Sequence, residues 1–84
     1  MDFKWDEWNE DHIARHAVAA AHAEFVVRHA RRPYPRRGRD GCWVAWGQDQ
    51  GGRYLQVAFS LVFDELDLED KIYVFHAREL TSHE

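Results

Sequence analysis

The stretch RYLQVAFSLVF, residues 53–63, decides the fold of this 84-residue chain. From position 55 onward every odd-numbered residue is large and apolar, namely Leu55, Val57, Phe59, Leu61 and Phe63. Successive side chains of a strand point to opposite faces, so these five share one face. The alternation predicts a long antiparallel strand with one face on a hydrophobic core.

Other strands are expected on both sides of this one. Residues 42–47 predict a buried strand, and Asp49 with the glycines that follow predicts a turn into residue 53. Residues 64–70 are an acidic connection, and residues 71–76 predict a final strand. Residues 78–84 are interpreted as the start of a short C-terminal helix.

The first half of the chain has a helical pattern instead. Residues 3–5 suggest a short initial strand, after which Asp6 is suited to cap a helix. Residues 17–31 are rich in alanine and predict a second helix, which Pro33 ends. The predicted fold class is therefore α+β, with two N-terminal helices packed on an antiparallel sheet and a short C-terminal helix.

Composition limits the class of protein. The length suits one domain, residues 1–84. A single cysteine, Cys42, excludes an internal disulfide and indicates a reducing compartment, so we expect a cytoplasmic protein. No apolar run approaches the roughly 20 residues of a membrane span, so no membrane partner is expected.

Charge is distributed unevenly along the chain. The net charge is −4, with acidic clusters in residues 2–11 and 64–70. Six of the eleven basic residues lie between positions 28 and 39, including the candidate RNA-binding residues Arg31, Arg32, Arg36, Arg37 and Arg39. Such a segment indicates an anionic partner. The alternative is that these arginines lie in a solvated loop. The negative net charge of the whole chain argues against nucleic acid as the partner.

Histidine and arginine are the residues that suggest chemistry. Phosphate-binding glycine loops, zinc-type cysteine pairs and serine-hydrolase motifs are all absent from the sequence. His76 ends the last predicted strand, Arg78 follows it, and Arg53 opens the long strand. Imidazole transfers protons near neutral pH, and guanidinium binds phosphate. These groups suit metal-free RNA cleavage; the alternative is that Arg78 pairs with Glu84 and His76 is packed.

Three further histidines allow other interpretations. His12 and His16 are four residues apart on one helix face, a spacing that would suit two metal ligands. The sequence supplies no local third ligand, and a polar helix face is the simpler interpretation. His22 lies on the apolar side of the second helix and is expected to pack there.

Three segments together resemble the BrnT family of toxins. The opening FKWDEWNEDHIARH, residues 3–16, has the family's Trp-Asp pair, then a helix, then a basic residue followed by His. The tail IYVFHARELTSHE, residues 72–84, has an apolar strand, then Ala-Arg, with Thr and Glu at the family's spacing. Gly47-Gln48 and GRYLQV, residues 52–57, resemble its central hairpin.

The resemblance implies a RelE-like fold and a ribonuclease toxin of a type II toxin–antitoxin pair. It implies RNA as the substrate, no metal or other cofactor, and a cognate BrnA-like antitoxin as partner; the oligomeric state is left open. The family positions that map here are His16, Arg53, the Ala77-Arg78 pair, Thr81 and Glu84. With His76, the candidate catalytic residues are His16, Arg53, His76 and Arg78.

The chain differs from the family pattern at three positions. Tyr73 stands where many members have arginine, His76 where they have serine, and Ala17 where they have glycine. Two of these changes touch the expected site. A second hypothesis is therefore a degenerate, non-catalytic module that binds an antitoxin or RNA.

Overall fold

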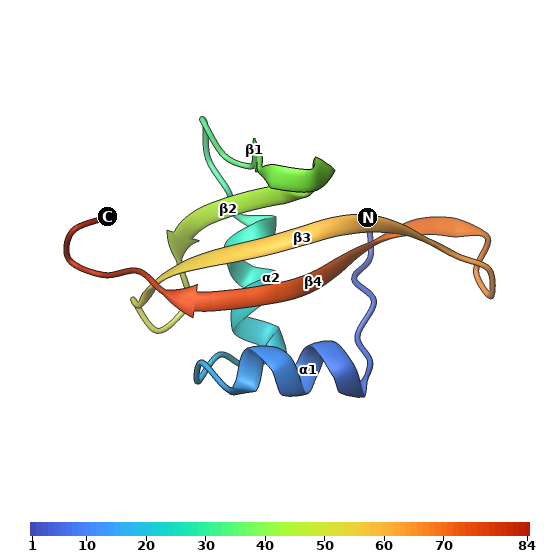
Figure 1. Cartoon of the computed structure of the whole chain (residues 1–84), viewed down its shortest axis with the longest axis horizontal. Helices are drawn as coiled ribbons and strands as arrows, with labels where there is room; N and C mark the ends of the chain where they lie inside the picture. Colours follow the sequence, from blue (N-terminus) through green and yellow to red (C-terminus); the bar gives the residue numbers. More distant parts are fainter.

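The computed structural model describes residues 1–84 and places two helices before the strands (Figure 1). The elements in chain order are α1 (Glu7–Ala14), α2 (Ala20–Arg28), β1 (Arg36–Arg37), the 3-10 turn η1 (Arg39–Gly41), β2 (Trp43–Gln48), β3 (Tyr54–Asp64) and β4 (Glu69–Glu79). The strands form one antiparallel sheet in the order β1-β2-β3-β4. Neither helix is long and apolar enough to cross a membrane.

Reciprocal hydrogen bonds between Asp6 and Asn9 fix the start of α1. The Asp6 carboxylate accepts from the Asn9 amide at 3.0 Å, and the Asn9 side-chain oxygen accepts from the Asp6 amide at 2.8 Å. The buried Asn9 side chain also donates to the carbonyl of Lys4. This capping box satisfies amides that a helix start otherwise leaves free, and it ties the helix to the preceding segment.

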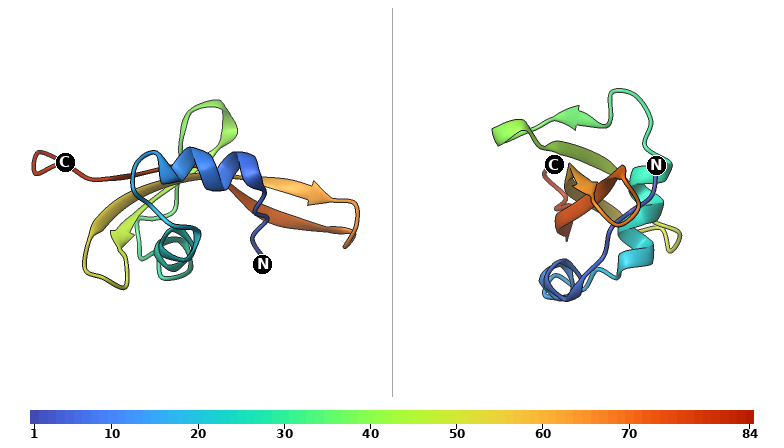
Figure 2. Two further views of the ribbon diagram at one scale, coloured as in Figure 1. Left: turned by 90° about the horizontal axis from the view of Figure 1, so that it is seen from below. Right: turned by 90° about the vertical axis from the view of Figure 1, so that its right-hand side faces the viewer.

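The two helices take different places against the sheet (Figure 2). α2 packs on β2 and β3 and covers one face, whereas α1 lies along β4, the edge strand. No helix lies across the opposite face of the sheet (Figure 2).

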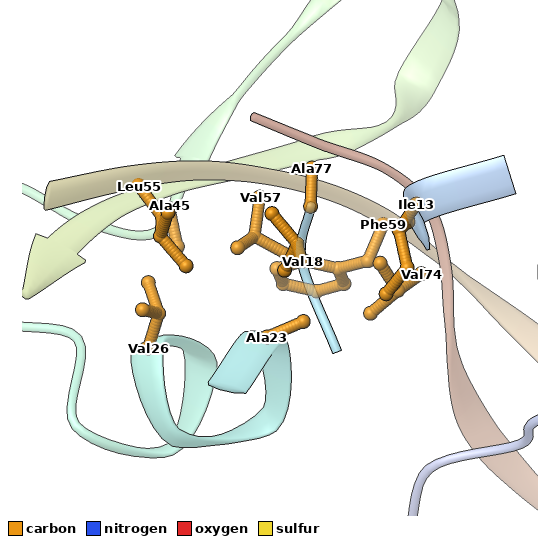
Figure 3. Packing of buried hydrophobic residues seen from close by; sticks show 10 residues of the cluster. All are labelled: Ile13, Val18, Ala23, Val26, Ala45, Leu55, Val57, Phe59, Val74 and Ala77. Atoms are coloured by element: carbon orange, nitrogen blue, oxygen red, sulfur yellow. The ribbon is translucent and has the colours of Figure 1, made fainter. Parts of the chain in front are cut away.

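A cluster of ten buried apolar side chains fills the space between α2 and the sheet (Figure 3). Its members are Ile13, Val18, Ala23, Val26, Ala45, Leu55, Val57, Phe59, Val74 and Ala77. Ile13 extends the cluster to α1, so one core anchors both helices. Truncating one of its larger aliphatic side chains to alanine should cost about 2–5 kcal/mol.

The pairing of β3 with β4 contains a one-residue bulge at Phe75. Ala58 pairs with His76 and Phe59 pairs with Val74, so Phe75 has no partner on β3. The bulge puts Val74 and Ala77, three positions apart, on the core side of the sheet, where both are fully buried.

The prediction of a short C-terminal helix at residues 78–84 is wrong. β4 continues to Glu79, which pairs with Leu55, and the Leu80 amide donates to the carbonyl of Tyr54 at 2.8 Å. β3 extends back to Tyr54 and therefore pairs with β4 as far as Glu79. This pairing uses the backbone groups of Arg78 and Glu79, where the expected helix would begin. The remaining residues end in a turn in which the Glu84 amide donates to the carbonyl of Thr81.

Two other elements differ from their predicted extents. The expected strand at residues 3–5 is a single bridge between Phe3 and Ile72. The second helix spans Ala20–Arg28, not residues 17–31, because Ala17 adopts a left-handed conformation with φ of 59° and Val18 enters the core before the helix begins.

The left-handed Ala17 predicts that Ala17→Gly stabilises the protein. A left-handed conformation costs a residue with a Cβ roughly 1–2 kcal/mol. Glycine avoids that cost but adds roughly 0.4–1 kcal/mol of unfolded-state entropy. We expect the free energy of unfolding in urea to rise by about 0.5–1 kcal/mol.

The matched control is Ala14→Gly, at an exposed position with helical conformation in the same segment. It should lower the free energy of unfolding by about 0.5–1 kcal/mol. Equal destabilisation by both changes would contradict the strain at Ala17.

Candidate functional site

The face of the sheet opposite α2, called the open face from here on, carries the His and Arg side chains of β4. Strand register places Val44, Trp46, Tyr54, Gln56, Ala58, Ser60, Tyr73, His76 and Arg78 on it. Since α1 lies along β4, one side of α1 adjoins the same surface. The open face therefore combines groups from both halves of the chain.

Three histidines meet where α1 adjoins β4. The ring centroid of His76 lies 5.2 Å from that of His16 and 6.1 Å from that of His12. His12 comes from α1, His16 from the turn that follows it, and His76 from the strand position after the bulge. The structure thus brings together two predicted catalytic residues that are 60 positions apart in the sequence.

The surroundings of His76 favour its neutral form. Burial lowers the pKa of His76 below its ordinary value of 6.5, and positive charge on His16, His12 and Arg78 lowers it further. A half-buried imidazole that is neutral at neutral pH is ready to accept a proton. This geometry fits the role of a general base.

Aromatic side chains form one wall beside the histidines. The Trp8 ring stacks on His12 at 4.9 Å between centroids and lies 6.5 Å from the ring of Tyr73. The Tyr73 hydroxyl donates to the carboxylate of Asp6, the residue that caps α1. Burial, and then this carboxylate, raise the pKa of the Tyr73 hydroxyl, so it stays protonated and is a hydrogen-bond donor.

Arg78 lies two residues after His76 and is held by Glu84. Its Nη1 and Nη2 atoms lie 2.8 Å and 2.5 Å from the two Glu84 oxygens, one of which also accepts from the Thr81 amide at 2.7 Å. The bond from Arg78, followed by that from Thr81, lowers the pKa of Glu84 to about 2. The pairing with Glu84 that the sequence offered as an alternative for Arg78 is therefore present, and it holds the guanidinium toward the C-terminal tail.

Arg53 is engaged at a different place. Its Nη1 donates to the carbonyl of Ala17 at 2.8 Å, and its Nε lies 3.4 Å from Asp49. Register puts it on the same side of β3 as Leu55, facing α2. Arg53 thus ties the β2–β3 turn to the α1–α2 connection, and its catalytic role stays a prediction.

The buried carboxylate of Asp49 organises that turn, a role that the sequence did not indicate beyond a turn residue. It accepts from the amides of Gly51 and Arg53 and lies 2.8 Å from Nδ1 of His22. Burial alone would raise the pKa of Asp49, but the His22 contact and the two amides lower it to about 2. His22 is therefore a hydrogen-bond partner of Asp49 rather than only a packing residue.

The arginines between positions 31 and 39 are exposed but do not form one surface. Arg36 pairs with Val44 and faces the open side, whereas Arg37 pairs with Trp43 and faces the α2 side. Each lies over an aromatic ring, Arg36 over Tyr34 at 5.9 Å and Arg37 over Trp43 at 4.9 Å. Among the predicted RNA-binding residues, register assigns Arg36 to the open face.

The metal-site hypothesis finds no support in the geometry. No group of three or more His, Cys, Asp or Glu side chains is arranged so that it could hold a metal ion. His12, one of the two candidate ligands, is instead stacked on Trp8.

The position of His76 predicts its titration. The His76 ring signals in a nuclear magnetic resonance titration should have a midpoint below 6.5, because burial and neighbouring positive charge oppose protonation. His16→Ala should raise that midpoint by removing one of these charges. A midpoint at or above 6.5, or one that His16→Ala leaves unchanged, would contradict the described surroundings.

The same shift has a consequence for stability. A histidine whose folded pKa lies below its unfolded value contributes stability above about pH 6.5, and that contribution is lost as the pH falls from there to the folded pKa. His76→Gln, which does not titrate, should therefore flatten the fall in unfolding free energy below neutral pH.

Comparison with known proteins does not identify this arrangement. No protein-family model, no curated protein and no solved structure matches the chain. The functional assignment therefore depends on the chain's own residues and on the ordered motifs of its sequence.

Proposed function

We propose that this chain is a metal-independent endoribonuclease toxin of the BrnT type, acting on RNA in the cytoplasm and neutralised by a cognate antitoxin. One observation carries the proposal: His76 lies beside His16 on an accessible face, with Arg78 two residues away on the same strand. Proton transfer and phosphate binding are the two functions that metal-free RNA cleavage requires.

The proposed reaction assigns one role to each group. His76 accepts the proton of a ribose 2′-OH, and the 2′ oxygen forms a bond to the adjacent phosphorus. The bond from phosphorus to the 5′ oxygen breaks, and His16 gives that oxygen a proton. The Arg78 guanidinium stabilises the charge that develops on the phosphoryl oxygens. The products are a 2′,3′-cyclic phosphate and a 5′-hydroxyl.

A test of this function uses protein purified without any partner. In the presence of a chelator it should cleave single-stranded RNA, and His76→Ala or Arg78→Ala should lower the rate at least about 100-fold. The matched control for Arg78→Ala is Arg28→Ala, an exposed arginine at the end of α2 that contacts Glu24 and Phe3. It should leave the rate unchanged.

Two results would contradict the proposal. One is the absence of RNA cleavage, together with no growth arrest when the protein is induced. The other is cleavage that depends on an added divalent metal.

A second candidate function is a non-catalytic module that binds a partner protein. Two observations favour it. Arg78 and Arg53 both already contact carboxylates, of Glu84 and Asp49, so neither has its charge free. In addition, the outer part of the β3–β4 hairpin, residues 61–70, exposes an apolar surface that nothing in the chain covers.

That outer hairpin has the properties of a protein-binding surface. β2 pairs with β3 only as far as Phe59, and the N-terminal segment pairs with β4 only at Ile72. The strands beyond these contacts form a two-stranded ribbon (Figure 1). Leu61, Phe63, Leu66 and Leu68 are 48–93% exposed. An isolated ribbon is marginally stable in water, and exposed apolar patches mark binding sites. Because acidic residues surround the patch, the fitting partner presents apolar side chains flanked by Lys or Arg.

The antitoxin-binding surface is tested with Leu61→Ser combined with Phe63→Ser. The probe is the protein encoded by the neighbouring reading frame. Binding should weaken at least about tenfold, because two apolar anchors are lost. The control, Val62→Ser, changes the opposite face of the same ribbon and should leave the affinity unchanged. Equal effects of both changes, or none, would contradict the assignment of this face.

A further inference from the structure

An aromatic cleft lies beside the proposed catalytic groups on the open face. It is lined by Trp46 and Gly47 of β2, Tyr54 at the start of β3, and residues of the tail from Leu80 to Glu84. Its volume is about 600 Å³, within the range of small-ligand sites. The sequence resemblance includes Thr81 and Glu84 of the tail, but neither it nor the proposed cleavage chemistry assigns a role to Trp46 or Tyr54.

Trp46 is held rigidly in the wall of this cleft. Its indole N–H donates to the side-chain oxygen of Gln56 at 3.0 Å, and Tyr34 stacks on it at 5.7 Å with 14° between the planes. Arg36 in turn covers the ring of Tyr34. The result is an ordered stack of guanidinium, phenol and indole. A fixed ring loses little entropy when another planar ring stacks on it.

Tyr54 supplies a second aromatic wall that is open to solvent. Its side chain is 58% exposed, and it pairs across the strands with Gln48, beside Trp46. An exposed tyrosine close to an ordered tryptophan gives two flat surfaces for stacking. Flat rings that stack irrespective of base identity are the common means of binding single-stranded nucleic acid.

An arginine lies at each end of this aromatic site. Arg36 is at the Tyr34 end, and Arg78 is at the other end, bonded to the Glu84 that lines the cleft. Gln56 is the register partner of both Trp46 and Arg78, so one strand separates the cleft wall from the catalytic arginine. Neighbouring strands are about 4.8 Å apart, which places the cleft within reach of a nucleotide adjoining the cleaved phosphate.

We propose that the cleft between Trp46 and Tyr54 binds one unpaired nucleobase of single-stranded RNA. This inference rests on the proposed function, since it identifies where a base next to the cleaved phosphate is held. Aromatic rings bind the base by stacking, and the arginines at either end bind the flanking phosphates. The site reads a base by its planar shape, so purines and pyrimidines both fit.

Binding is measured first, with labelled RNA octamers of adenylate and of uridylate. Trp46→Ala and Tyr54→Ala should each weaken binding about tenfold, because each removes a stacking surface. Tyr54→Phe keeps the ring and should bind as the wild type does. The control is Phe63→Ala, which removes an equally exposed ring from the outer hairpin and should have no effect.

A second measurement separates RNA from free nucleotide as the source of the base. Adenosine monophosphate is added while the indole N–H signals are followed by nuclear magnetic resonance. The Trp46 signal should shift, while the Trp5 signal should not, because its N–H is bonded to Glu24 away from the cleft. RNA as the ligand predicts that the octamer binds more tightly than the mononucleotide; equal affinities would overturn the RNA assignment.

Cleavage kinetics separate this inference from the proposed function. Tyr54→Ala should raise KM and leave kcat largely unchanged, in contrast to His76→Ala. If the wild type cleaves RNA and both cleft variants bind and cleave normally, the base-binding cleft is wrong and the ribonuclease function stands. If RNA binds through Trp46 and Tyr54 without being cleaved, the catalytic proposal fails and the cleft stands.

Discussion

The bulge at Phe75 determines which groups meet on the open face. In an unbroken strand Tyr73 and His76 would point to opposite sides, because side chains alternate. The unpaired Phe75 returns both to the same side, beside Asp6, Trp8 and the α1 histidines. It also lets Val74 and Ala77 both enter the core. One inserted residue therefore connects the packing of the core with the composition of the candidate site.

The fold was predictable wherever periodicity is strong. The alternation of residues 53–63 indicated β3, and Asp6 indicated the start of α1. The bulge was not predictable, because residues 72–75 are a continuous apolar run and only pairing with β3 shows where an extra residue fits. The same pairing extends β4 to Glu79 and removes the expected C-terminal helix. Strand extent depends on the partner strand, and the sequence of one strand does not contain that information.

The candidate site was predictable by residue type more than by arrangement. His16, His76 and Arg78 were singled out, and the structure places them close together. Arg53 was singled out with them but bonds to Asp49 and the Ala17 carbonyl. The sequence indicates Trp46 and Tyr54 only as strand residues. Their significance depends on the tail packing beside them, which no local pattern indicates.

Charge separation gives the molecule two distinct ends. Acidic residues gather at the outer hairpin, and basic residues gather around β1, on a different side of the molecule (Figure 1). Between them the charge of Arg78 is paired with Glu84, and α1 adds the acidic residues Glu7, Glu10 and Asp11 beside the open face. An anionic RNA and a basic protein would accordingly approach from different directions, which suits a protein that has both a substrate and a neutralising partner.

The central claim is that His76 and its neighbours cleave RNA through the ribose 2′-OH. The most direct test is the chemical identity of the ends produced when partner-free protein acts on a defined RNA oligonucleotide. We expect 2′,3′-cyclic phosphate and 5′-hydroxyl ends, and no cleavage when a 2′-deoxynucleotide replaces the nucleotide at the cleaved bond. Ends with a 3′-hydroxyl and a 5′-phosphate, or cleavage of the deoxy-substituted substrate, would contradict it.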